Sequence, residues 1–425
     1  MVFIGALIVV LTFVAIIKRY ETRLVLFLSG LLMALISLNP LAAFDAFAKT
    51  MAHPTLVPII CSVMGFAYVA KATKCDQHLV RLLTRPLSKV RPIIIPGTVI
   101  VTFFINIALT SAAGVSAAVG TILIPILIRA GVKPEMAAAA VFAGTFGSVL
   151  SPGNPHNVYV AEMAKQDVMS IIAVHAPTSI IAGLISAASL AVVAYVLKED
   201  RGYEPKLAGG PASGVAAAEA EGEPVSLIKA LVPVLPLVLI ILATPQIGVL
   251  PKSFSIPAAM LTGAMVAWAV TRVNPQEIAK SFFDGIGYAY ANVIGIIVAA
   301  SVFTAGMKAI GLTGALIEAM KHSTTAVNLG ATFGPFLIAV LGGSGDAATL
   351  AFNGAVTPHA AEFGLTIARL GSIANLAGAL GRTMSPVAGA AIVCAGLAGV
   401  NPMELAKRTA PGMIIAAIVA MLLLL

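Results

Sequence analysis

The sequence predicts an all-α polytopic membrane protein with about ten transmembrane helices, two re-entrant hairpins and two inverted repeats. Three observations support this fold class. The chain of 425 residues is 59% hydrophobic and only 10% charged, which is far from the balance of a soluble domain. Nearly uncharged segments of 16 to 20 residues recur along its length, as spanning helices require. Prolines and polar residues interrupt several of these apolar segments, where they should break a helix.

Ten segments fit a membrane span, and two of them are interrupted. The first segment has neither a basic flank nor a small-residue cleavage site, so we expect a retained helix rather than a signal peptide. The ten spans are 2–17, 24–38, 54–72, 134–169 (interrupted), 177–197, 228–244, 254–271, 290–309, 366–398 (interrupted) and 410–425.

Two further apolar stretches do not fit as simple spans. Residues 92–130 carry LTSAAGVSAAVG at their centre, and residues 326–363 carry LGGSGDAAT. Each stretch is too long for one helix, and we expect each to be a re-entrant hairpin that enters and leaves the membrane on the same side. Small polar tips persist at membrane depth only when they are buried in protein or face water.

The two halves of the chain share an ordered set of residues. Gly144, Gly147, Ser151 and Pro152 recur as Gly378, Gly381, Ser385 and Pro386, and the same order holds elsewhere at offsets of 233 to 237. Each half has five spans, an odd number, so the second half is expected to insert upside down. The loops that this orientation makes cytoplasmic hold 19 of the 26 Lys and Arg residues, in agreement with the positive-inside rule. Both termini are therefore expected outside the cytoplasm.

Two other segments are expected at the cytoplasmic side. The Gly-, Ala- and Pro-rich residues 198–225 form a linker between the halves, with a composition typical of disorder. The basic amphipathic residues 76–92 form an arm on the inner membrane surface. Because the net charge of +8 follows from loop topology, it does not indicate nucleic acid. The three cysteines have no metal-ligand or disulfide spacing.

The interrupted helices predict a transport site. Inverted repeats with broken helices are the architecture of secondary transporters, whose site lies where the breaks meet. Helix N-termini offer unpaired N–H donors and partial positive charge, which suits an anion. The neutral groups expected to line this site are the amides of Asn154, Asn157 and Asn353 and the hydroxyls of Thr110, Ser111, Ser116, Ser151, Ser344, Thr349, Thr383 and Ser385.

Two charged residues lie in this apolar setting. Arg382 is expected to bind a substrate carboxylate, because a charge at membrane depth costs at least about 2.5 kcal/mol and marks a pathway. Its guanidinium matches a carboxylate in bidentate geometry. The alternatives are an ion pair with Asp346 or a side chain that reaches the inner surface. Asp346, at the second hairpin tip, is expected to carry a coupling proton, to help bind sodium, or to pair with Arg382. His156 is expected to be a packed or hydrogen-bonded residue.

An intramembrane enzyme is not favoured, since the sequence has no HExxH motif and no nucleophile–base pair. A cation or proton antiporter with Asp346 as ion carrier stays open. So do carriers of citrate, another organic anion or an oxyanion. No cofactor is expected apart from a coupling ion, H⁺ or Na⁺.

Three runs of sequence resemble a known family. GTFGSVLSPGNPHNVYVAEMA, GGSGDAATLAFNGAVTPHAAEFG and NLAGALGRTMSPVAGAAIVCAG are similar to the DcuC type of anaerobic C4-dicarboxylate transporter, within the ion transporter superfamily. The resemblance implies a homodimer in the bacterial inner membrane that exchanges or exports fumarate, succinate, malate or aspartate.

The resemblance also implies an elevator-type mechanism with a scaffold part and a moving transport part. The scaffold would be residues 1–90, including the arm, and 226–325, and the transport part 91–197 and 326–425. The site would be lined by the tips Thr110–Gly114 and Gly343–Ala347, which include Gly343, Ser344 and Gly345, and by Ser151–Asn157 and Arg382–Ser385.

Overall fold

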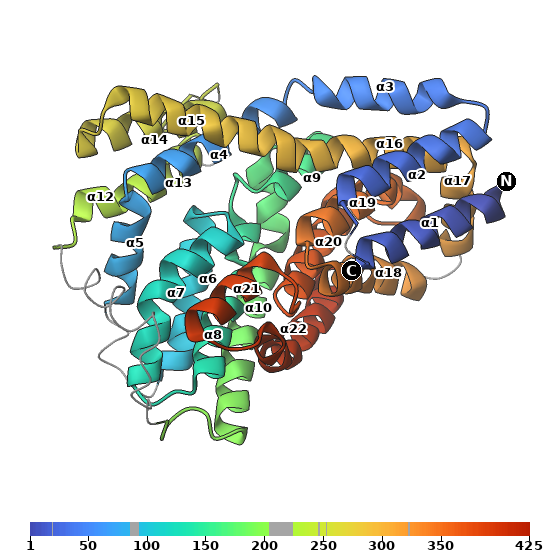
Figure 1. The fold of residues 1–425 in the computed structure, drawn as a ribbon. Coiled ribbons are helices and arrows are strands. Elements are labelled where there is room, and N and C mark those ends of the chain that lie inside the picture. The colour runs from blue at the N-terminus through green and yellow to red at the C-terminus, as the bar shows by residue number, and fades with distance from the viewer. Residues whose placement is uncertain (19, 86–92, 204–223, 245–246, 252, 322–323) are drawn as a thin grey trace.

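A computed structural model describes residues 1–18, 20–85, 93–203, 224–244, 247–251, 253–321 and 324–425, and every regular element in these ranges is helical. Figure 1 shows the helices in chain order. The predicted linker 198–225 and arm 76–92 fall partly outside the described residues; the arm is helical over Cys75–Thr84. The first half contains α1 (Val2–Ile17), α2 (Thr22–Ile36), α3 (Pro40–Met51), α4 (Leu56–Ala72), α5 (Cys75–Thr84), α6 (Ile94–Ala108), α7 (Ala112–Arg129), α8 (Pro134–Ala143), η3 (Gly147–Leu150), α9 (Pro155–Ala164) and α10 (Val168–Val196).

The second half follows a similar order. Its elements are α12 (Leu227–Leu231), η4 (Val232–Val234), α13 (Leu235–Leu242), α14 (Ile256–Thr271), α15 (Pro275–Ala289), the π-helical turn η5 (Tyr290–Ile294), α16 (Gly295–Ala309), α17 (Leu312–Lys321), α18 (Thr324–Gly342), α19 (Gly345–Ala355), η6 (Thr357–Phe363), α20 (Ile367–Arg382), α21 (Gly389–Ala398) and α22 (Pro402–Leu424).

Six helical segments of the described chain are long and apolar enough to cross a membrane, or seven if α3 and α4, bent by 47°, form one span. Six shorter apolar helices, among them α1, α2 and α14, accompany them. Two of the six long segments, α7 and α18, are arms of the predicted hairpins. The structure therefore supports a polytopic membrane protein, while the number of ten spans and the re-entrant course of the hairpins stay predictions.

Two predicted boundaries were wrong for identifiable reasons. The span expected at 177–197 begins at Val168, where Asp167 caps the helix by accepting from the Met169 and Ser170 amides. The helix continues through Pro177, as transmembrane helices tolerate. The span expected at 290–309 is the end of a 35-residue helical segment from Pro275 to Ala309, because Asn274 and Pro275 supply an earlier helix start.

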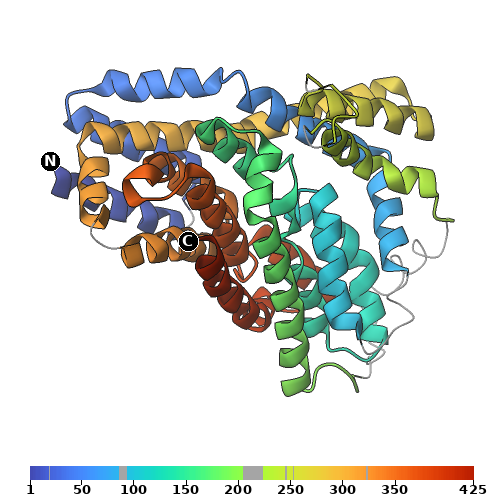
Figure 2. The same cartoon turned by 180° about the vertical axis from the view of Figure 1, so that it is seen from behind.

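Hydrophobic packing divides the described chain into two main regions. The largest buried cluster draws almost all its residues from 94–194 and 327–424. A second cluster joins 63–75 with 232–278, and a third joins 8–33 with 299–312 and Ala355. Figures 1 and 2 show α15, α16, α2 and α3 as a layer along one side, with α6–α10 and α18–α22 beneath it. Each region is thus built from both halves of the chain.

One close helix contact in the first half has a matching contact in the second. A methyl group added at Gly147, beside α8, would overlap the carbonyl oxygen of Phe103 in α6. One added at Gly381 in α20 would overlap the carbonyl oxygen of Phe336 in α18. The sequence pairs Gly147 with Gly381, and the two phenylalanines stand at a similar offset. Matching residues therefore make matching contacts, which supports the predicted duplication.

Candidate functional site

The first helix break lies between α8 and α9, in the run GSVLSPGNPHN. Its two prolines lack an amide hydrogen and interrupt helical hydrogen bonding. Asn154 caps α9 by accepting from the His156 amide at 2.9 Å, and its side-chain amide donates to the Ser148 carbonyl at 3.0 Å. Asn106 of α6 accepts from the Ser148 amide at 2.9 Å. The side-chain amides of Asn154 and Asn106 thus fix the conformation of the break, because buried backbone N–H and C=O groups need hydrogen-bond partners.

A buried chain of amides links this break to the second half. Asn157 Oδ1 accepts from Asn375 Nδ2 at 3.3 Å and lies 3.3 Å from His175 Nε2. Asn353 Nδ2 donates to Asn375 Oδ1 at 2.8 Å, and Thr357 Oγ1 donates to Asn353 Oδ1 at 2.8 Å. All five residues are buried. Asn157 and Asn353, expected to contact substrate, are engaged here with Asn375 of α20.

Arg382 ends α20 at the second break. Its Nη2 donates to the Thr145 carbonyl, at the end of α8, over 2.7 Å. Its Nη1 is buried and has no hydrogen-bond partner among the residues that the structure describes. The Arg382 guanidinium therefore bridges the two breaks through Nη2, while its Nη1 is left free to donate to another group. A buried charged donor without a partner is costly, so an oxygen of a bound anion would satisfy it.

Asp346 lies in the first turn of α19, which Ser344 caps by accepting from the Ala347 amide at 3.2 Å. Its Oδ1 is 3.0 Å from Nε2 of His156, on α9. The alternative of an ion pair with Arg382 is not found: the two charges interact electrostatically, but no N–O distance within 4.0 Å joins them. His156, which the sequence analysis expected to be a packed or hydrogen-bonded residue, is the partner of Asp346. The only sequence signal for it is its position directly after the break.

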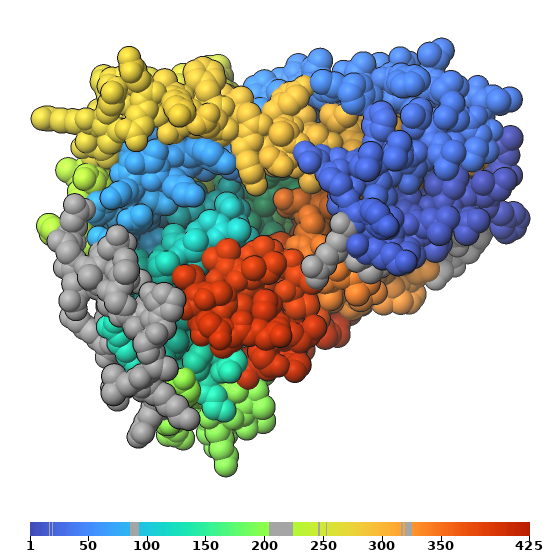
Figure 3. Space-filling model, viewed as in Figure 1, coloured from blue at the N-terminus to red at the C-terminus, as the bar shows by residue number. Residues whose placement is uncertain are grey.

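Both hairpin tips pack against the second break. Gly343 has a left-handed backbone with φ +74°, and a Cβ there would lie 2.8 Å from the Val387 side chain. A Cβ on Gly345 would lie 3.0 Å from the Gly378 carbonyl oxygen and 3.4 Å from Arg382 Cβ. Ala113, at the first tip, lies 4.0 Å from the Cβ position of Gly389. Figure 3 shows α21 at the surface beside α7. The predicted convergence of tips and breaks is therefore present around residues 378–389.

The remaining predicted hydroxyls mostly bond within their own segments. Such bonds satisfy the hydroxyl locally and leave its contact with substrate a prediction. Ser111 accepts from the Gly114 amide at 3.1 Å, Thr383 donates to the Ala379 carbonyl at 2.8 Å, Ser151 accepts from the Gly153 amide and Ser385 from the Val387 amide, each at 3.4 Å, and Thr349 donates to the Ala374 carbonyl at 3.4 Å.

Two hydroxyls differ from this pattern. Ser116, inside α7, is fully buried and its oxygen has no hydrogen-bond partner. Thr110 and Ser151 line a cavity of about 30 Å³ between the first tip and helices α4, α13 and α14. A cavity of this size holds about one water molecule, so a four-carbon diacid enters here only if the tip moves. In the part of the chain that the structure describes, no group of three His, Cys, Asp or Glu side chains forms a metal site.

Comparisons with known proteins agree along the whole chain. The model of a family described as C4-dicarboxylate anaerobic carrier matches residues 2–425. An uncharacterized transporter of Haemophilus influenzae is 44% identical over 283 residues, which cover 65% of this chain and all of that protein. The anaerobic C4-dicarboxylate transporter DcuC of Escherichia coli K12 is 25% identical over 96% of this chain and 92% of its own length.

The fold is also found among solved structures. A chain from "Structure and Function of Neisseria gonorrhoeae MtrF Illuminates a Class of Antimetabolite Efflux Pumps" superposes with a TM-score of 0.61 at 14% identity. The match covers 90% of this chain and 82% of that one. At this identity the likeness concerns the fold alone.

Proposed function

Because the chain belongs to the C4-dicarboxylate anaerobic carrier family, we propose that it is a secondary active transporter of C4-dicarboxylates such as fumarate, succinate, malate or aspartate. The family is one of membrane transporters, and the chain carries the apolar helices that such proteins need. The choice of C4-dicarboxylates as substrates rests on the names of distant relatives. The chemistry of the helix breaks supports this choice.

One observation carries the proposal: the uncommitted donor of Arg382 lies where both hairpin tips meet the second break. The N-terminus of α19 begins beside Arg382, and those of α7 and α21 lie beside each other. A guanidinium and exposed helix N–H groups together suit a carboxylate. The proposed lining is the predicted one, with Arg382 binding one substrate carboxylate and the tip residues Ser111, Gly343, Ser344 and Gly345 completing the pocket.

We assign the movement to an elevator-type mechanism. The buried clusters support a scaffold of about 1–90 and 226–325 and a transport part of about 91–197 and 326–425. The small cavity beside Thr110 and Ser151 lies between these parts, where a sliding transport part would open space. We also propose a homodimer in a bacterial inner membrane, with both termini on the periplasmic side.

Counterflow of labelled fumarate and succinate into proteoliposomes tests the function. Parallel assays with labelled citrate, with labelled sulfate and with an imposed cation gradient test the alternative functions. We expect exchange of the C4-dicarboxylates and its loss in Arg382→Ala, because the site then lacks its cation. Exchange only of citrate or sulfate would contradict the substrate class.

Arg369→Ala is the matched control, since Arg369 is an exposed arginine on the same helix, α20. This variant should exchange dicarboxylates at the wild-type rate. Undiminished exchange by a folded Arg382→Ala protein would remove Arg382 from the site.

A further inference from the structure

His156 is a buried polar residue whose ring has one close polar neighbour, Asp346. Its side chain is 7% exposed, and neither ring nitrogen has a partner in hydrogen-bond geometry. Nevertheless Nε2 lies 3.0 Å from Asp346 Oδ1. Asp346 is different: its side chain is 59% exposed. The pair therefore joins a buried ring nitrogen to a carboxylate at an open position.

Among the described residues of the elements packed against α19, two charged or titratable groups face Asp346. The elements packed against α19 are α9, α16, α18, α20 and η6. His156 on α9 contacts Asp346, and Arg382 on α20 interacts with it electrostatically. Helix α18 has no titratable residue. The other groups on these elements lie elsewhere: Tyr159 faces Gly354, Glu162 pairs with His53, His359 with Glu362, and Lys308 and Arg369 are exposed.

We propose that Asp346 is a resident carboxylate: before substrate binds it lies against His156 and within the field of the Arg382 guanidinium, and it takes up one proton when a dicarboxylate displaces it. The inference rests on the proposed function and deepens it. A substrate carboxylate and Asp346 compete for the same two groups, the His156 ring nitrogen and the Arg382 guanidinium. When the substrate occupies them, Asp346 faces a dianion, and two carboxylates that close together favour protonation of one of them.

The step balances with one proton from water. The contact between Asp346 Oδ1 and His156 Nε2 breaks, a substrate oxygen takes the place at His156, and an O–H bond forms on Asp346. Sodium does not fit this centre, because the Arg382 guanidinium already supplies positive charge near the carboxylate and His156 Nε2 lies 3.0 Å from its oxygen. The sequence left proton and sodium unranked as coupling ions, and the geometry favours the proton.

Calorimetric titration of the purified full-length protein with fumarate tests the idea. The titration is run at fixed pH in buffers of different ionisation enthalpy, with sodium and with choline. The wild type should take up close to one proton per fumarate without needing sodium, and its affinity should rise by up to tenfold per unit fall in pH, the limit for one linked proton. Asp346→Asn should bind fumarate at least as tightly at high pH, because the competitor is gone, and should take up no proton.

The controls separate this inference from the proposed function. Asp45→Asn, which changes an exposed carboxyl on α3, should behave like the wild type, and Asp346→Glu should keep the proton uptake. Absence of fumarate binding by the wild type would contradict both proposals. Binding without proton uptake, binding that requires sodium, or uptake that persists in Asp346→Asn would overturn this inference alone. If Asp346→Asn does not fold, the proton number of the wild type and of Asp346→Glu still decides the outcome.

Discussion

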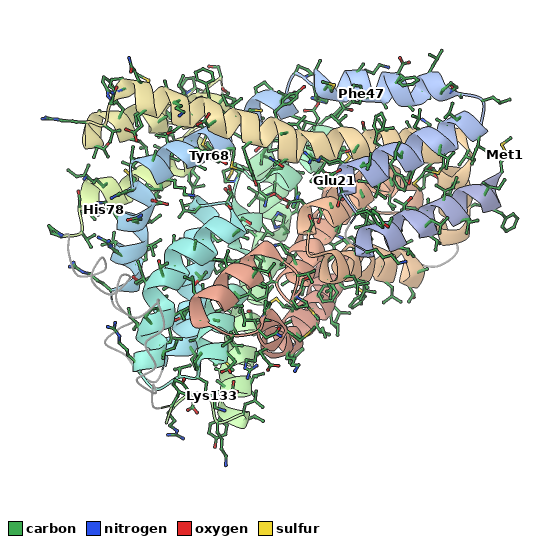
Figure 4. The ribbon with its side chains drawn as sticks, in the orientation of Figure 1. Met1, Glu21, Phe47, Tyr68, His78 and Lys133 are labelled. Carbon is green, nitrogen blue, oxygen red and sulfur yellow. The ribbon has the colours of Figure 1, made fainter. Side chains whose placement is uncertain are left out.

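Arg408 donates two hydrogen bonds of 2.7 Å to the two carboxylate oxygens of Glu199, and both side chains are buried. Glu199 follows α10, and Arg408 lies in α22, so the pair joins the last helices of the two halves. Lys133 Nζ lies 3.7 Å from Glu199 Oε1, and Figure 4 labels Lys133 at the end of the molecule far from the α15–α16 layer. The ion pair therefore locks one end of the proposed transport part.

Removal of one partner of this pair should destabilise the protein. We expect Glu199→Ala to cost about 1–3 kcal/mol, because Arg408 Nε and Nη2 lose their buried acceptors while its Nη1 keeps the contact with Glu404. The double variant Glu199→Leu with Arg408→Met should recover most of this loss. Thermal unfolding in detergent, followed by circular dichroism, measures both. Glu277→Ala on the exposed first turn of α15 is the control, and an equal melting temperature for Glu199→Ala would contradict the prediction.

The two matched glycines should be equally intolerant of a side chain. Alanine at Gly147 or Gly381 would force a methyl group into a backbone carbonyl of the neighbouring helix, and overpacking of this kind costs about 1–3 kcal/mol or more. Both variants should show lower melting temperatures and lower yield. Gly396→Ala in α21, where a Cβ meets no atom within 4 Å, should be neutral or slightly stabilising. A tolerated Gly381→Ala would remove this contact as support for the duplication.

Asn375→Ala should weaken the link between the halves. The substitution leaves Asn353 Nδ2 without its acceptor and Asn157 Oδ1 without one donor, and unsatisfied buried groups cost about 1–3 kcal/mol. We expect a lower melting temperature than for Asn292→Ala, whose side chain bonds only to its own helix at Tyr288. Asn375→Ala should also reduce fumarate affinity through the displaced breaks while the proton uptake per bound fumarate is kept. A loss of proton uptake would place Asn375 in the proton-binding group instead.

Arg382→Lys should separate charge from geometry. A lysine keeps the positive charge but cannot both donate to Thr145 and present a second donor in the guanidinium plane. We expect the folded variant to bind fumarate about tenfold to a hundredfold more weakly than the wild type in equilibrium titration, while the maximal heat per site is kept. Wild-type affinity in Arg382→Lys would show that a point charge suffices there.

The breaks were predictable because proline and small polar residues interrupt long apolar runs, and the structure ends α8 and α20 at Ala143 and Arg382, close to the predicted positions. The partners of the polar groups were not predictable. Residues 156 and 346 are far apart in sequence, as are 157 and 375, and no local pattern states which face of a helix meets which break. Helix starts were also missed where a cap such as Asp167 extends a helix through a proline.

The sequence by itself determined that the chain is a helical membrane protein with interrupted apolar segments. The reason is that both signals are local: the hydropathy of a segment, and the missing backbone N–H of a proline. Its family could also be recognised from three runs of residues. Only the tertiary structure decided that Asp346 meets His156 rather than Arg382, and that Asn157 and Asn353 share Asn375. These pairings depend on how the two halves of the chain pack together. When they pack, each half buries polar groups of the other and has to provide their hydrogen-bond partners.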